Sequence, residues 1–210
     1  MEATILKRSI VLIRHGQTLD NERGVAQGWS DSALTELGLA QVRQVAMRLK
    51  AMQPIAIYSS TLPRARATAA AIAATTELAV RELPDLREMN CGEWEGASFE
   101  DLQSRNPAHY SEWSRNPEVS CPGGESYREV RDRMASGIRF IEEEAGSESG
   151  TILVVSHGTA IRVAATALLD LPLSAARSFA QDNTAVNIFE RRGERYVLKL
   201  WNDVTHCGGE

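Results

Sequence analysis

Two histidines of this chain stand in matching sequence contexts, in the tripeptides RHG and SHG. His15 comes just after the apolar run Ile10–Ile13, and His157 comes just after Ile152–Val155. Continuous apolar runs are typical of strands that are buried on both faces of a sheet. If the two strands are parallel neighbours, both histidines emerge at the carboxyl edge of the sheet, where α/β proteins bind ligands. A lone histidine at a strand end is usually structural, but this pair indicates a functional site.

Two arginines add positive charge near this predicted edge. Arg14 directly precedes His15, and Arg64 falls in the first turn of a helix that Pro63 begins. A cation at a helix N-terminus is unfavourable against the helix dipole, unless an anion such as phosphate binds there. The alternative is that Arg64 is a solvated surface residue, which is our interpretation of Arg66.

A carboxylate would complete the set of groups. Glu88 opens a polar region after a predicted strand, and Glu93 and Glu95 compete with it because spacing alone does not choose among them. Arginines bind phosphate oxygens bidentately, and a neutral imidazole can attack phosphorus as a covalent nucleophile. An acid can protonate the leaving oxygen and then deprotonate the attacking water. Two arginines, two histidines and one acid therefore predict phosphoryl transfer.

Composition and missing motifs exclude several other classes of protein. The net charge of −5 gives no basic field for nucleic acid, and no apolar stretch reaches membrane-spanning length. Three cysteines without metal-type spacing, and the lack of a secretory signal, predict a reducing, cytoplasmic location. The sequence has no Walker loop, dinucleotide fingerprint, HExxH motif, Asp-rich constellation or serine nucleophile elbow. We therefore expect no metal, no organic cofactor, no nucleic acid and no membrane partner.

The elements that must position these residues alternate between strand and helix. Further strands are predicted at 55–58 and 78–80 and in a hairpin of 185–189 with 196–200, with helices at 35–49, 63–74, 126–141 and 160–169. Thr35, and Ser60 or Thr61, are predicted helix caps, and Ser126 with Glu129 has capping-box spacing. The pattern predicts an α/β fold with a mainly parallel sheet and an antiparallel edge. Residues 1–210 are predicted to form one domain, with a lid-like insertion at about 89–124 that carries short helices near 100–105 and 110–115.

Four sequence blocks resemble the histidine phosphatase, or phosphoglycerate-mutase-like, superfamily, in family order. IRHGQTLDN resembles the phosphohistidine signature, and SSTLPRARATA resembles the second-arginine block. LREMNCGEWEG resembles the acid block, and VVSHGTAIR resembles the second-histidine block, with PGGES and DNTAVN as further similar stretches. The resemblance spans roughly residues 10–200. It implies a three-layer α/β/α fold and catalysis without a metal.

The resemblance also implies roles for individual residues. It makes His15 the nucleophile that becomes phosphohistidine, and it selects Glu88 as the general acid. The phosphate pocket would be completed by Arg14, Arg64 and His157.

Further residues match positions of the family that lie at or near the substrate. Asn21 corresponds to an asparagine that contacts phosphate, and Gly158 would offer a backbone N–H. The remaining matches to positions near the substrate are Gln17, Thr18, Gln27 and Gly28.

The length of the predicted insertion bears on the choice between two reactions of the family. His157 follows Glu88 by 69 positions, whereas cofactor-dependent mutases carry a noticeably longer insertion there. The resemblance therefore implies a phosphatase that acts on a small phosphorylated metabolite. A 2,3-bisphosphoglycerate-dependent phosphoglycerate mutase is the alternative. A non-catalytic phospho-ligand binder is a third reading, which the intact set of catalytic residues opposes.

Within the family the chain is most similar to the metal-independent phosphoserine phosphatases, in YSEWSRNPEVSCPGGES, SFAQDNTAVN and LKLWNDVTH. Cys91, however, stands where those enzymes carry a histidine that is tied to phosphoserine preference. Phosphoserine, α-ribazole phosphate, sugar phosphates and broad specificity therefore remain open. His206 is a candidate for the pocket, Trp94 and Trp113 are expected to pack the lid against the core, and a homodimer is expected from the resemblance.

Overall fold

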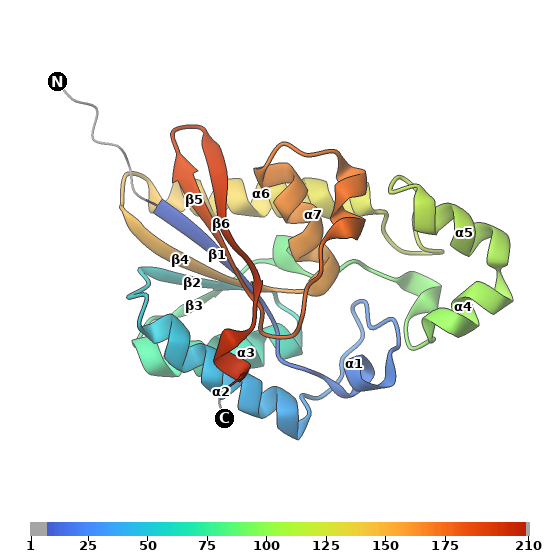
Figure 1. The fold of residues 1–210 in the computed structure, drawn as a ribbon, viewed down its shortest axis with the longest axis horizontal. Helices are drawn as coiled ribbons and strands as arrows, with labels where there is room; N and C mark the ends of the chain where they lie inside the picture. The colour runs from blue at the N-terminus through green and yellow to red at the C-terminus, as the bar shows by residue number, and fades with distance from the viewer. Residues whose placement is uncertain (1–7, 209–210) are drawn as a thin grey trace.

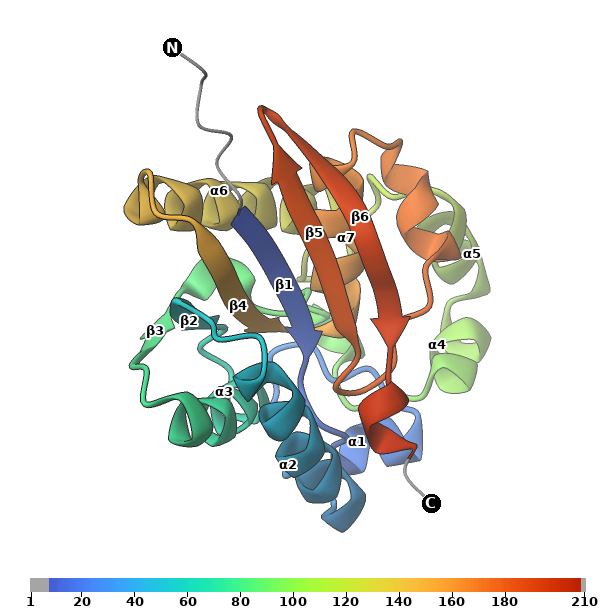
Figure 2. The same ribbon diagram turned by 60° about the vertical axis from the view of Figure 1, so that its left-hand side comes forward.

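A six-stranded mixed sheet forms the centre of the molecule in the computed structural model, which describes residues 8–208 (Figures 1 and 2). The strand order is β3-β2-β4-β1-β5-β6, with β1 parallel to β4 and antiparallel to β5. The strand bounds are β1 Arg8–Arg14, β2 Ala56–Ser59, β3 Val80–Glu82, β4 Gly150–Ser156, β5 Val186–Arg192 and β6 Arg195–Asp203. The predicted parallel sheet with an antiparallel edge is confirmed, and β1 and β4 are the neighbours that the two histidines require.

Helices cover both faces of this sheet and give the three-layer α/β/α architecture. The α-helices are α1 Leu19–Arg23, α2 Glu36–Lys50, α3 Pro63–Thr76, α4 Phe99–Arg105, α5 Pro107–Arg115, α6 Tyr127–Ala145 and α7 Gly158–Leu168. Helices α2 and α3 lie on one side of the sheet and α6 and α7 on the other (Figure 1). Within residues 8–208, no helix combines the length and the apolar character needed to cross a bilayer.

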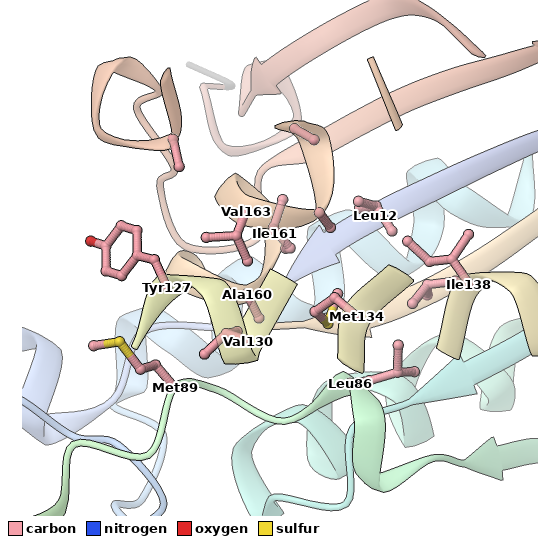
Figure 3. Close-up of a cluster of buried hydrophobic side chains, with 14 of the residues drawn as sticks. Leu12, Leu86, Met89, Tyr127, Val130, Met134, Ile138, Ala160, Ile161 and Val163 are labelled. Carbon is pink, nitrogen blue, oxygen red and sulfur yellow. The ribbon is translucent and has the colours of Figure 1, made fainter. Parts of the chain in front are cut away.

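The apolar runs of β1 and β4 are buried because alternate residues serve two separate cores. Leu12 and Val154 point into the core shared with α6 and α7, whereas Ile13 and Val155 point toward α2 and α3. Figure 3 shows the first core, in which Val130, Met134 and Ile138 of α6 lie beside residues of α7 and below Leu12. Both faces of the central strands are thereby closed to water, which holds their carboxyl ends rigidly in place.

Helix α6 follows its sequence signals closely. The Ser126 hydroxyl accepts from the Glu129 amide, and the Glu129 carboxylate accepts from the Ser126 amide, which is the predicted capping box. The apolar side chains on one face of this helix are buried: Val130, Met134, Ile138 and Ile141.

Helix α2 begins after its predicted cap Thr35. Leu39, which lies at helical spacing from the buried Val42 and Val45, is 39% exposed, whereas Gly38 is buried. A Cβ on Gly38 would lie 2.0 Å from the Gln17 carbonyl oxygen, so the helix packs directly on backbone there. This close approach of the backbones at Gly38, together with the Val42 side chain that lies against Gly16, packs α2 against the loop that follows β1.

Two other local predictions need correction. Strand β3 lies two residues later than expected, because it is a three-residue edge strand whose side chains are half-buried or exposed and give little apolar signal. Neither Ser60 nor Thr61 is the cap of α3, since the helix begins after Leu62 without a side-chain cap. Ser60 is instead turned toward the candidate site.

The 89–124 segment leaves the sheet region and carries α4 and α5, which lie beyond the carboxyl ends of β1 and β4 (Figure 1). Its two tryptophans, Trp94 and Trp113, meet edge to face with ring centroids 5.0 Å apart. Tyr127 of α6 packs against Trp113, and the Arg177 guanidinium lies over both of these rings. An aromatic cluster thus joins the segment to the core, as expected for the two tryptophans.

Candidate active site

A cavity of about 280 Å³ opens at the carboxyl ends of the parallel strands, between the sheet and the 89–124 segment. Most of the residues singled out from the sequence line it: Arg14, His15, Asn21, Gln27, Gly28, Arg64, Glu88 and Gly158. The His157 ring lies next to that of His15, with ring centroids 5.1 Å apart. The structure therefore brings together the two histidines, two arginines and one acid from separate parts of the chain.

His15 is held as a neutral imidazole with one nitrogen free. Its Nδ1 lies 2.7 Å from the Gly16 carbonyl oxygen, which only accepts, so Nδ1 carries the proton and Nε2 keeps its lone pair. Burial, and then the charges of Arg64 and Arg14, lower the pKa of His15 well below 6.5. An unprotonated Nε2 at neutral pH is the form that can attack phosphorus.

His157 is fully buried beside it and is oriented by Ser60. The Ser60 hydroxyl accepts from the Leu62 amide and lies 2.7 Å from His157 Nε2, so its own proton can be donated to that nitrogen. The proton of the neutral ring then belongs on Nδ1, which has no partner among the described residues. Burial, followed by the charge of Arg64, lowers the pKa of His157 well below 6.5. The free Nδ1–H can donate to an oxygen atom of a ligand.

Backbone carbonyls hold the two arginines while part of each guanidinium stays unused. Arg64 donates to the carbonyl oxygens of Gly28 at 2.7 Å and Ser30 at 2.9 Å, and Arg14 donates to that of Gln181 at 2.5 Å. The Nε atoms of both arginines are buried without a partner in the described part of the chain. Burial lowers the pKa of Arg14 to about 10, so both side chains remain cations at neutral pH. Unsatisfied buried donors of this kind are costly unless an anion binds.

Glu88 reaches the cavity at the N-terminus of α7. Its carboxylate accepts from the amides of Met89, Thr159 and Ala160 at 2.8–3.1 Å. Its backbone carbonyl accepts from Arg133 and from the Trp29 indole. Glu93 and Glu95, which compete with Glu88 in the sequence, are not among the residues that line the cavity.

Those two competitors lie outside the cavity lining. Glu95 is turned to the amides of Trp29 and Ser30, and Glu93 is exposed.

Four smaller matches also face the cavity. Gln27 Nε2 is buried without a partner in residues 8–208, so it can donate to a ligand. Asn21 accepts from Asn183 through its side-chain oxygen. Gly28 adopts φ +57° beside the Glu95 carboxylate, where a Cβ would collide. A Cβ on Gly158 would lie 3.5 Å from Arg14 Nε, so the glycine lies directly against this guanidinium.

Apart from His157, which lies beside His15 but is not among the lining residues, three predicted residues do not line the cavity. Gln17 accepts from the Thr35 hydroxyl, and Thr18 caps α1 in a capping box with Asn21, so both organise the loop after β1. His206 is bound to Arg48 and Thr184 and lies apart from the lining. Gln17 and Thr18 therefore shape the loop that carries His15, and His206 takes no part in the cavity.

The structure adds residues that sequence reasoning missed. Arg162 and Gln181 line the cavity, and Asn183 donates to the His15 carbonyl. Arg162 and Asn183 lie in stretches already noted as family-like, but only the folded chain shows which of their side chains turn inward.

Cys91 also lines the cavity, as a neutral thiol. A hydrogen bond with Cys121, together with burial, raises the pKa of Cys91. Cys91 therefore offers an uncharged, weakly polar surface to the ligand.

The cavity offers an anion several unused donors and one free imidazole nitrogen, which suits a phosphoryl group. Within residues 8–208, no three His, Cys, Asp or Glu side chains are grouped so that they could hold a metal ion.

Comparison with known proteins bears directly on this site. The model of the histidine phosphatase superfamily, branch 1, matches residues 10–204. The chain belongs to this superfamily. Among similar proteins is a metal-independent phosphoserine phosphatase of Arabidopsis thaliana, which is 36% identical over 94% of this chain and 82% of that protein. A probable phosphoglycerate mutase of Yersinia pestis is 33% identical over 91% of this chain and 89% of its own length.

A solved phosphatase structure shares the fold over almost its whole length. The mycobacterial glucosyl-3-phosphoglycerate phosphatase in complex with VO3 superposes with a TM-score of 0.84 and 30% identity. The match covers 93% of this chain and 99% of that one. The three-layer fold expected from the resemblance is therefore confirmed.

Proposed function

We propose that this histidine phosphatase is a metal-independent phosphomonoesterase that acts on a small phosphorylated metabolite through a phosphohistidine at His15. The observation that carries the proposal is the neutral His15, whose free Nε2 lies in a cavity lined by two arginines with unused donors. The name of the Arabidopsis relative supports hydrolysis without a metal.

The first half of the reaction transfers the phosphoryl group to the protein. Arg14, Arg64 and His157 Nδ1–H bind the phosphoryl oxygens, and His15 Nε2 attacks phosphorus in line with the ester oxygen. As the phosphorus–oxygen bond breaks, Glu88 gives its proton to the leaving oxygen. The products are an alcohol and phosphohistidine.

The second half returns the protein to its starting state. The Glu88 carboxylate takes a proton from water, whose oxygen attacks phosphorus and displaces His15 Nε2. Inorganic phosphate leaves, and both Glu88 and His15 recover their original protonation. The backbone donors hold the Glu88 carboxyl group in one position, from which it acts in both steps.

The same phosphoenzyme would serve the alternative reaction, and the relative named as a probable phosphoglycerate mutase favours keeping that alternative. In a mutase, the phosphoryl group passes to a second hydroxyl of a retained phosphoglycerate instead of to water. Parallel assays of phosphate release and of 2,3-bisphosphoglycerate-dependent phosphoglycerate interconversion separate the two. We expect phosphate release to dominate.

We also propose that residues 1–210 act as one catalytic domain in which the 89–124 segment covers the cavity as a lid. Residues 1–7 and 209–210 lie outside the described part of the chain. The aromatic contacts of Trp94 and Trp113 next to the cavity support the lid. The homodimer expected from the resemblance is tested by analytical ultracentrifugation.

The direct test is release of phosphate from an aryl phosphate in the presence of a chelator. We expect activity in the unaltered protein and none in His15→Ala, while His109→Ala, which removes a histidine outside the cavity lining, remains active. Loss of activity on chelation, or activity that survives in His15→Ala, would contradict the mechanism.

A further inference from the structure

The cavity holds a third arginine that the phosphoryl reaction does not use. Four charged side chains line it: Arg14, Arg64, Arg162 and Glu88. In the proposed mechanism, Arg14 and Arg64 bind the phosphoryl group and Glu88 moves the proton. The positive charge of Arg162 is left without an assigned partner.

Arg162 also lacks an ionic partner among residues 8–208. It lies half-buried on α7, where its Nη2 donates to the Thr159 hydroxyl at 3.0 Å. Its Nε is buried without a partner, and no carboxylate of residues 8–208 forms an ion pair with it. Surface arginines such as Arg128, in contrast, do pair with carboxylates. A partly desolvated guanidinium without a counter-charge is unfavourable, so the site is arranged for an anion that arrives with the ligand.

Two further groups along the cavity wall are unused. Both side-chain amide atoms of Gln181 are buried without a partner in the described part of the chain, and so is the Trp113 indole nitrogen. Both residues line the same cavity as Arg162. Together they offer two donors and one acceptor to the hydroxyl or carboxyl oxygens of a leaving group.

We infer that Arg162 binds a carboxylate on the leaving group of the substrate, with Gln181 and Trp113 bonding to its other oxygens; this rests on the proposed function. One guanidinium matches the single charge and the two oxygens of a carboxylate, whereas the phosphoryl dianion already engages two arginines. The substrate is therefore a phosphate ester of a hydroxy acid.

The same wall disfavours a cationic group on the substrate. Glu88 is the only carboxylate among the described residues that line the cavity, and proton transfer occupies it. An ammonium group would enter a cavity with three guanidinium groups and no free acid. A phosphorylated hydroxy acid therefore binds better than a phosphorylated amino acid of the same size.

Four small phosphate esters, with or without a carboxylate and with or without an ammonium group, test this subsite. Their binding is measured by titration calorimetry in a His15→Ala background, which prevents turnover. They are 3-phosphoglycerate, O-phosphoserine, glycerol 3-phosphate and O-phosphoethanolamine. We expect 3-phosphoglycerate to bind at least tenfold more tightly than glycerol 3-phosphate and more tightly than O-phosphoserine. Equal binding of 3-phosphoglycerate and glycerol 3-phosphate would overturn the inference.

Substitution of Arg162 assigns the effect to that residue. Arg162→Met or Arg162→Gln should reduce the preference for 3-phosphoglycerate over glycerol 3-phosphate about tenfold, and Arg162→Lys should keep part of it. Arg139→Met is the matched control, because Arg139 makes the same type of contact with a hydroxyl three residues earlier on an exposed helix face. The Arg139→Met variant should keep the full preference for 3-phosphoglycerate over glycerol 3-phosphate. If the Arg162 variants weaken both ligands equally, Arg162 serves the phosphoryl group and the inference is wrong.

Titration needs no turnover, so it reports on Arg162 independently of hydrolysis. Absence of phosphate release from every ester by the unaltered protein would contradict the proposed function and leave the binding result standing. Hydrolysis without any preference for the carboxylate would contradict the subsite and leave the proposed function standing.

Discussion

The two histidines and two arginines of the site share one physical property, which is that each buries polar side-chain atoms inside the fold. His15 and His157 are neutral because burial and neighbouring guanidinium groups oppose their protonation. Arg14 and Arg64 keep unused donors beside them. A phosphoryl dianion satisfies these donors and adds the negative charge that the site lacks, so binding and preparation for attack coincide.

Glu88 is the residue whose role depends most on the leaving group. Glu88→Gln removes the acid, so we expect kcat/KM for an alkyl phosphate to fall about a hundredfold more than for an aryl phosphate. The reason is that an aryl oxide is a good leaving group and needs little protonation by Glu88, whereas an alkoxide depends on it. Glu93→Gln, an exposed neighbour outside the cavity lining, is the control. Equal losses for both leaving groups would contradict the general-acid role.

Helix α6 acts on the site by fixing backbone rather than by supplying a reactive group. Arg133 of α6 donates to the carbonyls of Asp85, Arg87 and Glu88, and pairs with Glu125 at 2.8 Å. It thereby ties the connection after β3 to a helix that is anchored in the core. We regard Arg133 as a positioning residue for Glu88.

Arg133→Met should therefore mimic a partial loss of Glu88. We expect kcat for an alkyl phosphate to fall about tenfold with little change in KM, because phosphate binding is unaffected while the acid is misplaced. Kinetics on alkyl and aryl esters measure this, with Arg128→Met as the control, since Arg128 pairs with Glu118 at the surface. A rise in KM without a change in kcat would contradict the positioning role.

Elements also show what sequence alone can predict. Strands β1 and β4 and helix α6 were predicted well, because continuous apolar runs and capping signals are local properties of the chain. The packing of Gly38 on the Gln17 backbone and the convergence of Arg162 with Gln181 were not predicted. They depend on contacts between segments far apart in the sequence, which no local pattern records.

The whole molecule carries a stability cost for holding two histidines neutral. The unfolded chain binds protons at both histidines below a pH of about 6.5, whereas the folded chain does not, because burial and then nearby arginines lower their pKa. The free energy of unfolding should therefore decrease as the pH falls from about 6.5 toward the lowered pKa values. Above that range these two groups add no pH dependence.

Chemical denaturation at several pH values measures this effect. Each histidine contributes at most about 1.4 kcal/mol per pH unit to the slope below its ordinary pKa. His157→Gln should remove its share and give a shallower slope than the unaltered protein. Identical slopes for the two proteins would show that His157 is not held neutral by the fold.

The phosphohistidine intermediate is the central claim, and intact-protein mass spectrometry tests it most directly. Glu88→Gln lacks the base for the second half of the reaction, so the phosphoenzyme should accumulate when an aryl phosphate is added with a chelator present. We predict a mass gain of one phosphoryl group, located on His15 by peptide analysis and absent when His15 is also changed to alanine. A phosphoryl group on another residue, or phosphate release with no phosphoenzyme in Glu88→Gln, would contradict the account.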